Sequence, residues 1–251
     1  NFDTAVSGRI RDKDRDTNDW FLGREKTYKF LRKRSYVFGC YQWAAVEHRG
    51  EAAWPRVCSC SGALDLFLQK KGAFYPNKSH WTKDPMAHIV PHWNFKGLEG
   101  REIPVTVYTN CEELELFLNG KPLGKRQIEK YGHGEWSVEY IPGTLEVKGY
   151  IGGKEVCCDK RVTTGRPAAL KLTQDNDFTA NGSDIALFTC ECVDENGLTV
   201  PDAAEYVHFS VTAPAKIIGT GSDNCDHNNV ANTDRKMYMG KIRVAVKLQK
   251  G

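Results

Sequence analysis

The sequence predicts a mainly β protein in which a short segment of α/β-barrel type precedes two immunoglobulin-like β-sandwiches. A helical pattern followed by an apolar run of strand length predicts the barrel-type segment. Apolar residues then alternate with period two from Ile103, and again beyond residue 184 after a Gly-Arg-Pro linker. Each alternating part has roughly 75–85 residues, close to the size of an immunoglobulin domain. The predicted domains are residues 1–91, 92–165 and 166–251.

Residues 18–34 are predicted to form a helix, which Asn18 or Asp19 can cap. The run from Tyr36 to Trp43 is largely apolar on both faces, which fits a buried parallel strand. A long loop over residues 47–62 follows. A helix, a buried strand and a loop in this order are typical of a (β/α)8 TIM barrel.

The rest of the chain is predicted to be all β. Asn119-Gly120 and Gly152-Gly153 are strong hairpin signals between alternating segments. In the first sandwich, strands are predicted at residues 103–107, 114–118, 136–140, 145–151 and 156–162. After the linker Gly165-Arg166-Pro167, strands are predicted at residues 169–172, 185–193, 207–211 and 242–248.

The composition excludes several classes of partner. The 251 residues include 35 basic and 32 acidic side chains, and no aromatic-plus-basic stacking pattern accompanies the basic segments Arg9–Arg15 and Arg24–Arg34. Nucleic-acid binding is therefore not expected. Apolar runs stay below the roughly 18–20 residues of a membrane span. The chain begins at Asn1 without an initiator Met or a signal peptide, which suggests a piece of a longer protein.

Cysteine and histidine spacing does not indicate a metal centre. The nine cysteines include no CxxC pair, so we expect buried free thiols, no structural zinc and no cofactor. His80, His88 and His92 lack zinc-site spacing and are expected to form hydrogen bonds where the barrel segment meets the sandwich. The oxygen-rich loop at residues 223–227 could hold a cation or be an ordinary turn, and the turn is favoured.

The loop after the predicted buried strand is the candidate site. Catalytic and binding residues of a (β/α)8 barrel lie at the C-terminal ends of its strands. Trp43 could offer its face to a sugar ring, and Glu47, His48, Arg49 and Glu51 could bind hydroxyl groups. The alternative is structural, with Trp43 in the barrel core and Arg49 and Glu51 as an ion pair.

Val37 to Trp54 resembles the eighth barrel strand and following loop of glycoside hydrolase family 2, the β-galactosidase and β-glycosidase type. The family pattern is Val-Trp-Thr-Gly-Phe-Asp-Tyr-Arg-Gly-Glu, and the chain keeps Trp43, Arg49, Gly50 and Glu51. It departs from the pattern at Gln42, Ala44, Ala45, Val46, Glu47 and His48. The similarity continues through residues 61–66, 78–81, 91–95, 107–111 and 116–120. From Pro167 the chain resembles the immunoglobulin-like C-terminal domain of bacterial members.

The resemblance implies a retaining β-glycosidase that hydrolyses O-glycosyl bonds of a β-linked oligosaccharide, with Trp43, Glu47, Arg49 and Glu51 as substrate-binding residues. The family's two catalytic glutamates end the fourth and seventh barrel strands, the acid/base within an Asn-Glu pair. No such pair precedes Trp43 in the sequence. The only glutamate before Trp43 is Glu25, which lies inside the predicted helix. Two of eight barrel units cannot close a barrel. The resemblance therefore implies that this chain holds no catalytic residue, is inactive alone, and needs the missing N-terminal part of the barrel.

Two alternatives stay open. The sandwiches could form a carbohydrate-binding module that holds sugar through Trp136, Tyr140 or Tyr206, or they could be a structural spacer. The compartment is not indicated by the sequence, although a bacterial polysaccharide-degrading parent would work in the periplasm or outside the cell.

Overall fold

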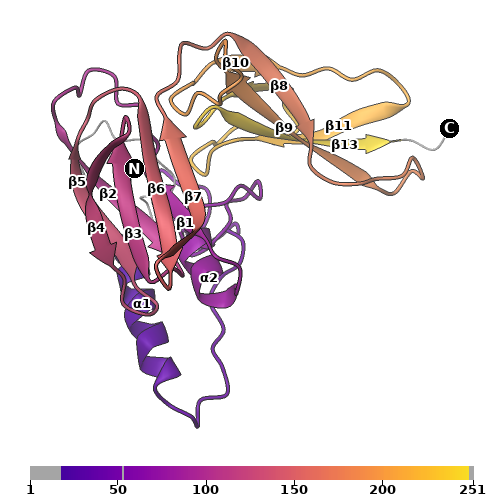
Figure 1. The fold of residues 1–251 in the computed structure, drawn as a ribbon. Helices are drawn as coiled ribbons and strands as arrows, with labels where there is room; N and C mark the ends of the chain where they lie inside the picture. Colours follow the sequence, from indigo (N-terminus) through magenta and orange to yellow (C-terminus); the bar gives the residue numbers. More distant parts are fainter. Residues whose placement is uncertain (1–17, 53, 249–251) are drawn as a thin grey trace. The chain divides into compact units, whose positions relative to one another are not determined.

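The structure is a computed structural model that describes residues 18–52 and 54–248, with side chains from Glu25 onward (Figure 1). Contacts within the chain group the described residues into two compact units. The first unit runs to Val46 and also holds residues 61–64 and 70–163; the second unit holds residues 47–60, 65–69 and 164 onward. Across the described part of the chain, no helix has the length and apolar character needed to cross a membrane.

Two helices belong to the first unit. α1 (Asn18–Arg32) confirms the predicted helix over residues 18–34. The predicted caps, Asn18 and Asp19, lie outside the residues whose side chains are described, and the basic segment Arg9–Arg15 lies outside the described chain. α2 (Phe74–Trp81), which the sequence did not predict, has Pro near its first turn, where a missing N–H costs no helical hydrogen bond.

The expected buried strand over residues 36–43 is wrong for this structure. The segment has no strand assignment, and Phe38 and Tyr41 are fully exposed. A parallel barrel strand is buried only when neighbours cover both of its edges and both faces. The described residues supply no such neighbours for this segment, so its apolar side chains face outward.

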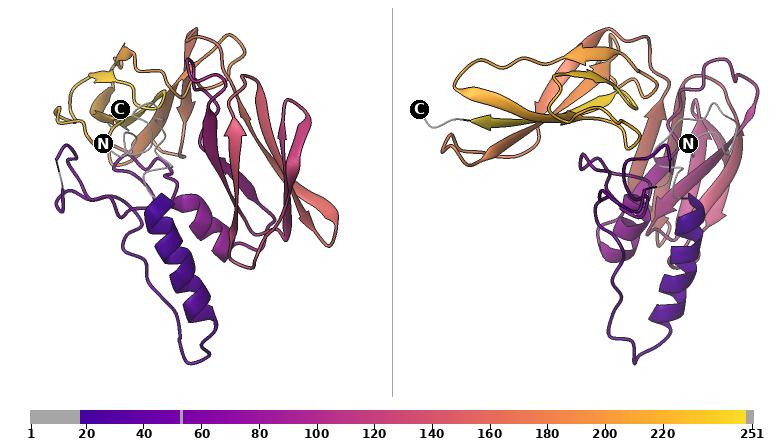
Figure 2. Two further views of the ribbon diagram at one scale, coloured as in Figure 1. Left: turned by 90° about the vertical axis from the view of Figure 1, so that its left-hand side faces the viewer. Right: turned by 180° about the vertical axis from the view of Figure 1, so that it is seen from behind.

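Seven strands of the first unit form two facing antiparallel sheets (Figures 1 and 2). The strands are β1 (Ala87–Val90), β2 (Glu102–Thr109), β3 (Glu113–Leu118), β4 (Lys121–Gln127), β5 (His133–Glu139), β6 (Thr144–Ile151) and β7 (Lys154–Val162). One sheet has the order β1-β2-β5 and the other β4-β3-β6-β7. β1 lies before the predicted boundary at residue 91 and pairs with β2, with Val90 opposite Thr106.

The predicted alternation decides which side chains enter the core of this sandwich. Ile103, Val105 and Val107 of β2 are buried and meet Leu114 and Leu116 of β3 in one apolar cluster. Both predicted hairpins are confirmed. Asn119 and Gly120, and then Gly152 and Gly153, all have positive φ, as a two-residue type I′ turn requires.

The second unit contains a four-stranded antiparallel sheet in the order β11-β13-β9-β8 and a short pair, β10-β12. The strands are β8 (Ala169–Gln174), β9 (Ile185–Val193), β10 (Tyr206–His208), β11 (Ala215–Gly221), β12 (Asp234–Lys236) and β13 (Lys241–Leu248). The predicted strand at 207–211 is therefore shorter than expected. Strand β8 is an edge strand whose Leu170 and Leu172 remain exposed.

Charged side chains attach α1 to the first sandwich, and an aromatic contact attaches it to α2. His133 Nδ1 lies 2.7 Å from the Glu25 carboxylate, and its Nε2 lies 3.1 Å from Glu135. Burial opposes the charged form of His133, but the hydrogen bonds to the two carboxylates outweigh it and raise its pKa. Tyr28 meets the ring of His80 edge-on, at 4.7 Å between centroids.

The other histidines near the predicted seam are packed against side chains of the first unit. His88 stacks on Tyr75 at 3.2 Å between ring centroids and lies 3.1 Å from the Arg161 guanidinium. His92 stacks on Phe95 at 4.8 Å. In residues 18–52 and 54–248, no group of three or more His, Cys, Asp or Glu is placed to hold a metal ion.

Candidate functional site

The candidate loop begins where two segments of the first unit run side by side. Val46 and Leu64 form a parallel bridge. The Leu64 N–H donates to the Ala45 carbonyl at 2.9 Å, and the Ala63 N–H donates to the Ala44 carbonyl at 3.2 Å. The named strands all pair antiparallel, so this short parallel contact is of a different kind from the sandwich ladders.

Trp43 comes just before this pairing and exposes 69% of its surface. The Trp43–Ala44 peptide bond is cis. Next to the pairing the first unit opens into a mostly apolar cleft of about 580 Å³. Its lining comes from three stretches, 40–45, 63–64 and 74–82, although Trp43 itself is not part of it.

Glu47 is the first site residue of the second unit and is almost fully buried, at 3% exposure. The Ser59 hydroxyl donates to the Glu47 carboxylate at 2.7 Å. The same hydroxyl oxygen accepts from the His48 backbone N–H at 3.2 Å and lies 3.1 Å from His48 Nδ1. The Glu47 carboxylate is thus held from inside the loop, which orders the loop.

Arg49 and Glu51 lie further along the same loop and are exposed. Arg49 forms an antiparallel bridge with Cys58, which closes the loop into a narrow hairpin-like shape. Gly50 and Glu51 both have positive φ, so the chain turns sharply there. The Glu51 carboxylate lies 3.5 Å from His48 Nε2, and the described contacts include no ion pair between Glu51 and Arg49.

A loop from the far end of the sequence, residues 222–233, supports the candidate loop within the second unit. The Asn224 carbonyl accepts from the Val57 N–H at 2.8 Å, and its side-chain oxygen accepts from the Leu66 N–H at 3.4 Å. His227 donates through Nε2 to the Pro55 carbonyl at 2.8 Å. These contacts join segments 158 to 172 residues apart in sequence, and no local sequence pattern indicates them.

The supporting loop is itself held by a buried ion pair. Arg235, at 2% exposure, lies 2.5 Å from the Asp226 carboxylate and also donates to the Asn229 carbonyl at 2.7 Å. Burial opposes ionisation of Asp226, but hydrogen bonds from the Asn228 backbone and from Arg235 outweigh it and lower its pKa. These contacts hold residues 226–229 of the supporting loop in one ordered turn.

Gly221, at the end of β11, comes just before the supporting loop and packs closely against another segment of the second unit. A Cβ atom at Gly221 would lie 1.8 Å from the ring of Phe67, which belongs to the second unit as well. Only glycine lets the end of β11 approach that ring. A larger residue at position 221 would therefore push β11 away from the 65–69 segment.

Comparison with known proteins places these features in a family. Residues 170–251 match glycoside hydrolase family 2 C-terminal domain 5, and residues 100–157 match a domain of unknown function, DUF4982. The chain is 34% identical over 234 residues to beta-galactosidase BoGH2A of Bacteroides ovatus, covering 90% of this chain. The chain belongs to glycoside hydrolase family 2.

Further comparisons show the same similarity to glycosidases. A putative beta-glucuronidase of Formosa agariphila is 34% identical over 88% of this chain. A beta-glycosidase structure from Bacteroides vulgatus superposes with a TM-score of 0.85 at 28% identity, over 90% of this chain and 30% of that one. The chain spans 27% of the length of the Bacteroides ovatus relative and 23% of the Formosa protein.

The three aromatic residues suggested as sugar contacts in the sandwiches of this family 2 chain differ in their exposure. Trp136 and Tyr140 are buried, at 7% and 1% exposure, so they are core residues and offer no face to a sugar. Tyr206 is exposed.

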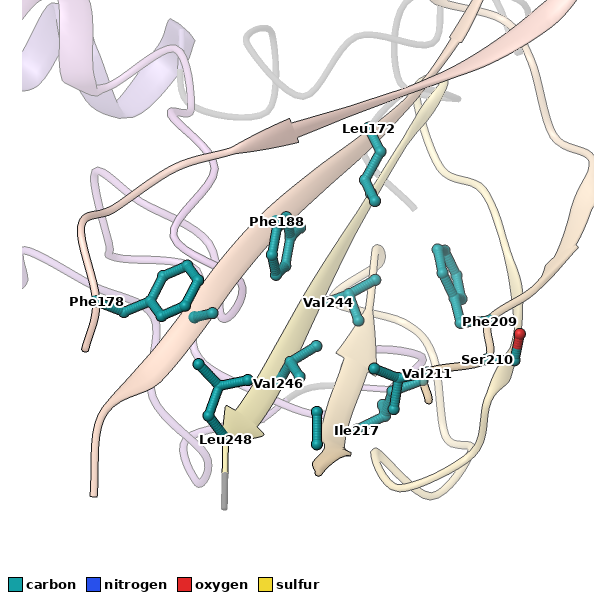
Figure 3. A pocket seen from close by; sticks show the side chains of 12 residues that line it. Leu172, Phe178, Phe188, Phe209, Ser210, Val211, Ile217, Val244, Val246 and Leu248 are labelled. Carbon is teal, nitrogen blue, oxygen red and sulfur yellow. The ribbon is translucent and has the colours of Figure 1, made fainter. Parts of the chain in front are cut away.

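A pocket of about 220 Å³ in the second unit is lined by apolar side chains such as Phe178, Phe188 and Phe209 (Figure 3). Ser210 supplies its side-chain hydroxyl, which is too little polar lining for a sugar.

Proposed function

We propose that this chain is the C-terminal part of a retaining family 2 β-glycosidase that hydrolyses O-glycosyl bonds of a β-linked oligosaccharide. Residues 1–91 are the last part of a (β/α)8 barrel, and residues 92–165 and 166–251 are immunoglobulin-like sandwiches that support the barrel rim. The parallel pairing of Ala44–Val46 with Ala63–Leu64 carries this proposal, because parallel neighbours are what a barrel strand requires.

The exposed aromatic side chains before the pairing support the same assignment. Tyr36, Phe38 and Tyr41 lie bare at the surface, and an apolar cleft opens beside them. Apolar area of this kind normally marks a surface that another part of a protein covers. The remaining barrel strands of a family 2 enzyme would cover it.

In this proposal the site residues divide into two roles. Trp43 stacks on the sugar ring, and Arg49 and Glu51, both exposed, reach substrate hydroxyl groups. Glu47 acts by positioning, because its buried carboxylate is held by Ser59. Asn224 and His227 hold the returning part of the loop through its backbone at Val57 and Pro55.

The chain alone is proposed to be inactive. A retaining glycosidase needs two carboxyl groups about 5–5.5 Å apart. Glu25, the one glutamate before Trp43, lies in α1 with its carboxylate bonded to His133 and to Lys29 at 2.7 and 2.6 Å. Burial works against ionisation of Glu25, but these cationic partners outweigh it and lower its pKa, which suits an ion pair and not a general acid.

A chimera tests the proposal. This chain replaces the matching C-terminal segment of the Bacteroides ovatus β-galactosidase, and hydrolysis of nitrophenyl β-galactoside is measured beside the isolated chain. We expect an active chimera and an inactive isolated chain. Trp43→Ala should lower kcat/KM of the chimera at least about tenfold, a loss of about 1.4 kcal/mol, whereas Tyr206→Ala serves as the exposed aromatic control. Turnover by the isolated chain, or equal effects of the two variants, would contradict the proposal.

A binding module is the other outcome that the experiment can reveal. Sugar binding by the isolated chain, measured by calorimetry with β-linked disaccharides and lost in Tyr206→Ala, would favour it. Absence of binding together with an active chimera favours the glycosidase part.

A further inference from the structure

Two cysteines of the first unit meet over strand β6 without being neighbours in sequence. Cys111 lies in the turn between β2 and β3, and Cys157 lies in the edge strand β7. Their sulfur atoms are 3.4 Å apart, at a separation of 46 residues. Cys111 is 4% exposed, while Cys157 is half-buried.

A glycine makes room for this contact. Gly149 of β6 pairs with Leu114 on one side and with Cys157 on the other. A Cβ atom at Gly149 would lie 2.7 Å from both the Cys111 and the Cys157 sulfurs. Any side chain there would force the two thiols apart, so the glycine provides the space in which they touch.

We propose that Cys111 and Cys157 are a disulfide-forming pair that closes when the chain meets a small-molecule disulfide oxidant of the glutathione type. A disulfide bond is about 2.05 Å long, so the sulfurs need to approach by roughly 1.4 Å from their present 3.4 Å. One of them lies on an edge strand, which can move more easily than a central strand.

The chemistry needs two exchange steps. Cys157, the more accessible thiol, passes its proton to the hydrogen-bonded Cys111 sulfur and attacks the oxidant; the oxidant's S–S bond breaks and one glutathione thiolate leaves. Cys111 then gives up that proton to water, attacks the Cys157 sulfur and expels the second glutathione thiolate. The protein loses two hydrogens and the oxidant becomes two thiols.

Electrostatics favour ionisation of the resting pair. The hydrogen bond that Cys157 donates lowers the pKa of Cys111 to about 6, against the opposing effect of burial, and it raises the pKa of Cys157. The hydrogen bond therefore favours the form of the pair in which one sulfur is ionised, which is the form that thiol–disulfide exchange requires.

The bond would join the edge strand β7 to the β2–β3 turn. It closes a 46-residue segment, which restricts the unfolded chain more than a short loop does. We expect the urea midpoint of the first unit to rise on oxidation and to return when dithiothreitol is added.

Peptide mapping tests the proposal on the full chain. The protein is incubated with oxidised glutathione, free thiols are alkylated, and non-reduced digests are analysed by mass spectrometry. We expect a peptide pair joined through Cys111 and Cys157, 2 Da lighter than the two reduced peptides. If the wild-type digest lacks this pair, or if the link uses the exposed neighbour Cys158 instead, the proposal is wrong.

Three variants sharpen the result. Cys158→Ser should keep the cross-link and the midpoint rise, whereas Cys157→Ser should lose both while keeping the far-ultraviolet circular dichroism of the wild type. Gly149→Ala should slow cross-linking at least tenfold under the same conditions. Equal midpoint rises in Cys157→Ser and Cys158→Ser would overturn the proposal, and the wild-type digest decides the question even where a variant does not fold.

Discussion

Arg235 holds the 222–233 loop of the second unit through a single buried guanidinium group. Its side chain is 2% exposed and lies 2.5 Å from the Asp226 carboxylate. It also donates to the Thr220 hydroxyl at 3.1 Å and to the Asn229 carbonyl at 2.7 Å. Arg235→Met keeps an apolar side chain of similar length and removes all three interactions.

The expected cost follows from what the substitution leaves behind. Breaking a buried ion pair by removing one partner costs about 3–5 kcal/mol. Asp226 keeps 13% exposure and the hydrogen bond from the Asn228 backbone, so we expect the low end, about 3 kcal/mol. The double variant with Asp226→Asn no longer carries the unpaired charge, and we expect a coupling of about 1–2 kcal/mol between the two sites.

Native-state hydrogen exchange of the β11 and β13 amides measures this cost within the second unit. Arg166→Met, at an exposed position, is the matched control and should stay within about 0.5 kcal/mol of wild type. The reasoning is refuted if Arg235→Met behaves like Arg166→Met or if the two single variants are additive.

The same pair has a defined pH dependence. The folded pKa of Asp226 is lowered from its ordinary 3.8, because hydrogen bonds to the carboxylate outweigh the effect of burial. The stability it contributes is therefore present above pH 3.8 and is lost as the pH falls through the lowered folded pKa. The gap between wild type and Arg235→Met should narrow over that acid range.

Two further predictions concern side chains that donate hydrogen bonds to buried carboxylates. His133→Gln should destabilise the first unit by about 1.5–3 kcal/mol at pH 5.5, because it removes one of the two cationic partners of Glu25 and leaves only Lys29. The raised pKa of His133 means that this contribution is complete below about pH 6.5 and fades as the pH rises through the folded value, so urea midpoints of wild type and variant should converge in alkali. Ser59→Ala leaves buried Glu47 without its hydroxyl donor and should cost about 1–3 kcal/mol by hydrogen exchange. The exposed Ser183→Ala should cost almost nothing, and equal effects would refute the role assigned to Ser59.

Strands whose pattern is local could be predicted well from the sequence. The alternation of Ile103, Val105 and Val107 gives the buried face of β2, and the Asn119-Gly120 signal gives the turn after β3. Both depend on a side-chain period of two or on backbone preferences of one or two residues. The short strand at Tyr206–His208 was predicted too long, because its pairing is limited by a partner, β12, of equal length.

The candidate site was only partly predictable. Trp43, Arg49 and Glu51 were marked as candidates by residue type and family pattern, and the structure leaves them exposed. The burial of Glu47 against Ser59 could not be predicted from spacing, because the hydroxyl comes from the returning arm of the loop. No pattern in the sequence predicts the contacts of Asn224 and His227, because the residues around them show only a composition typical of turns.

The sequence by itself determined the β-rich character of the chain, its hairpins and its membership of glycoside hydrolase family 2, since all of these are carried by local pattern and residue identity. Only the tertiary structure decided which polar side chains are buried and what meets them. Burial depends on neighbours brought from far along the chain, as the contact of Asn224 with Val57 and the meeting of Cys111 with Cys157 over Gly149 show. The exposed run over residues 36–43 follows from the same cause, because an apolar strand is buried only where partners exist to cover it.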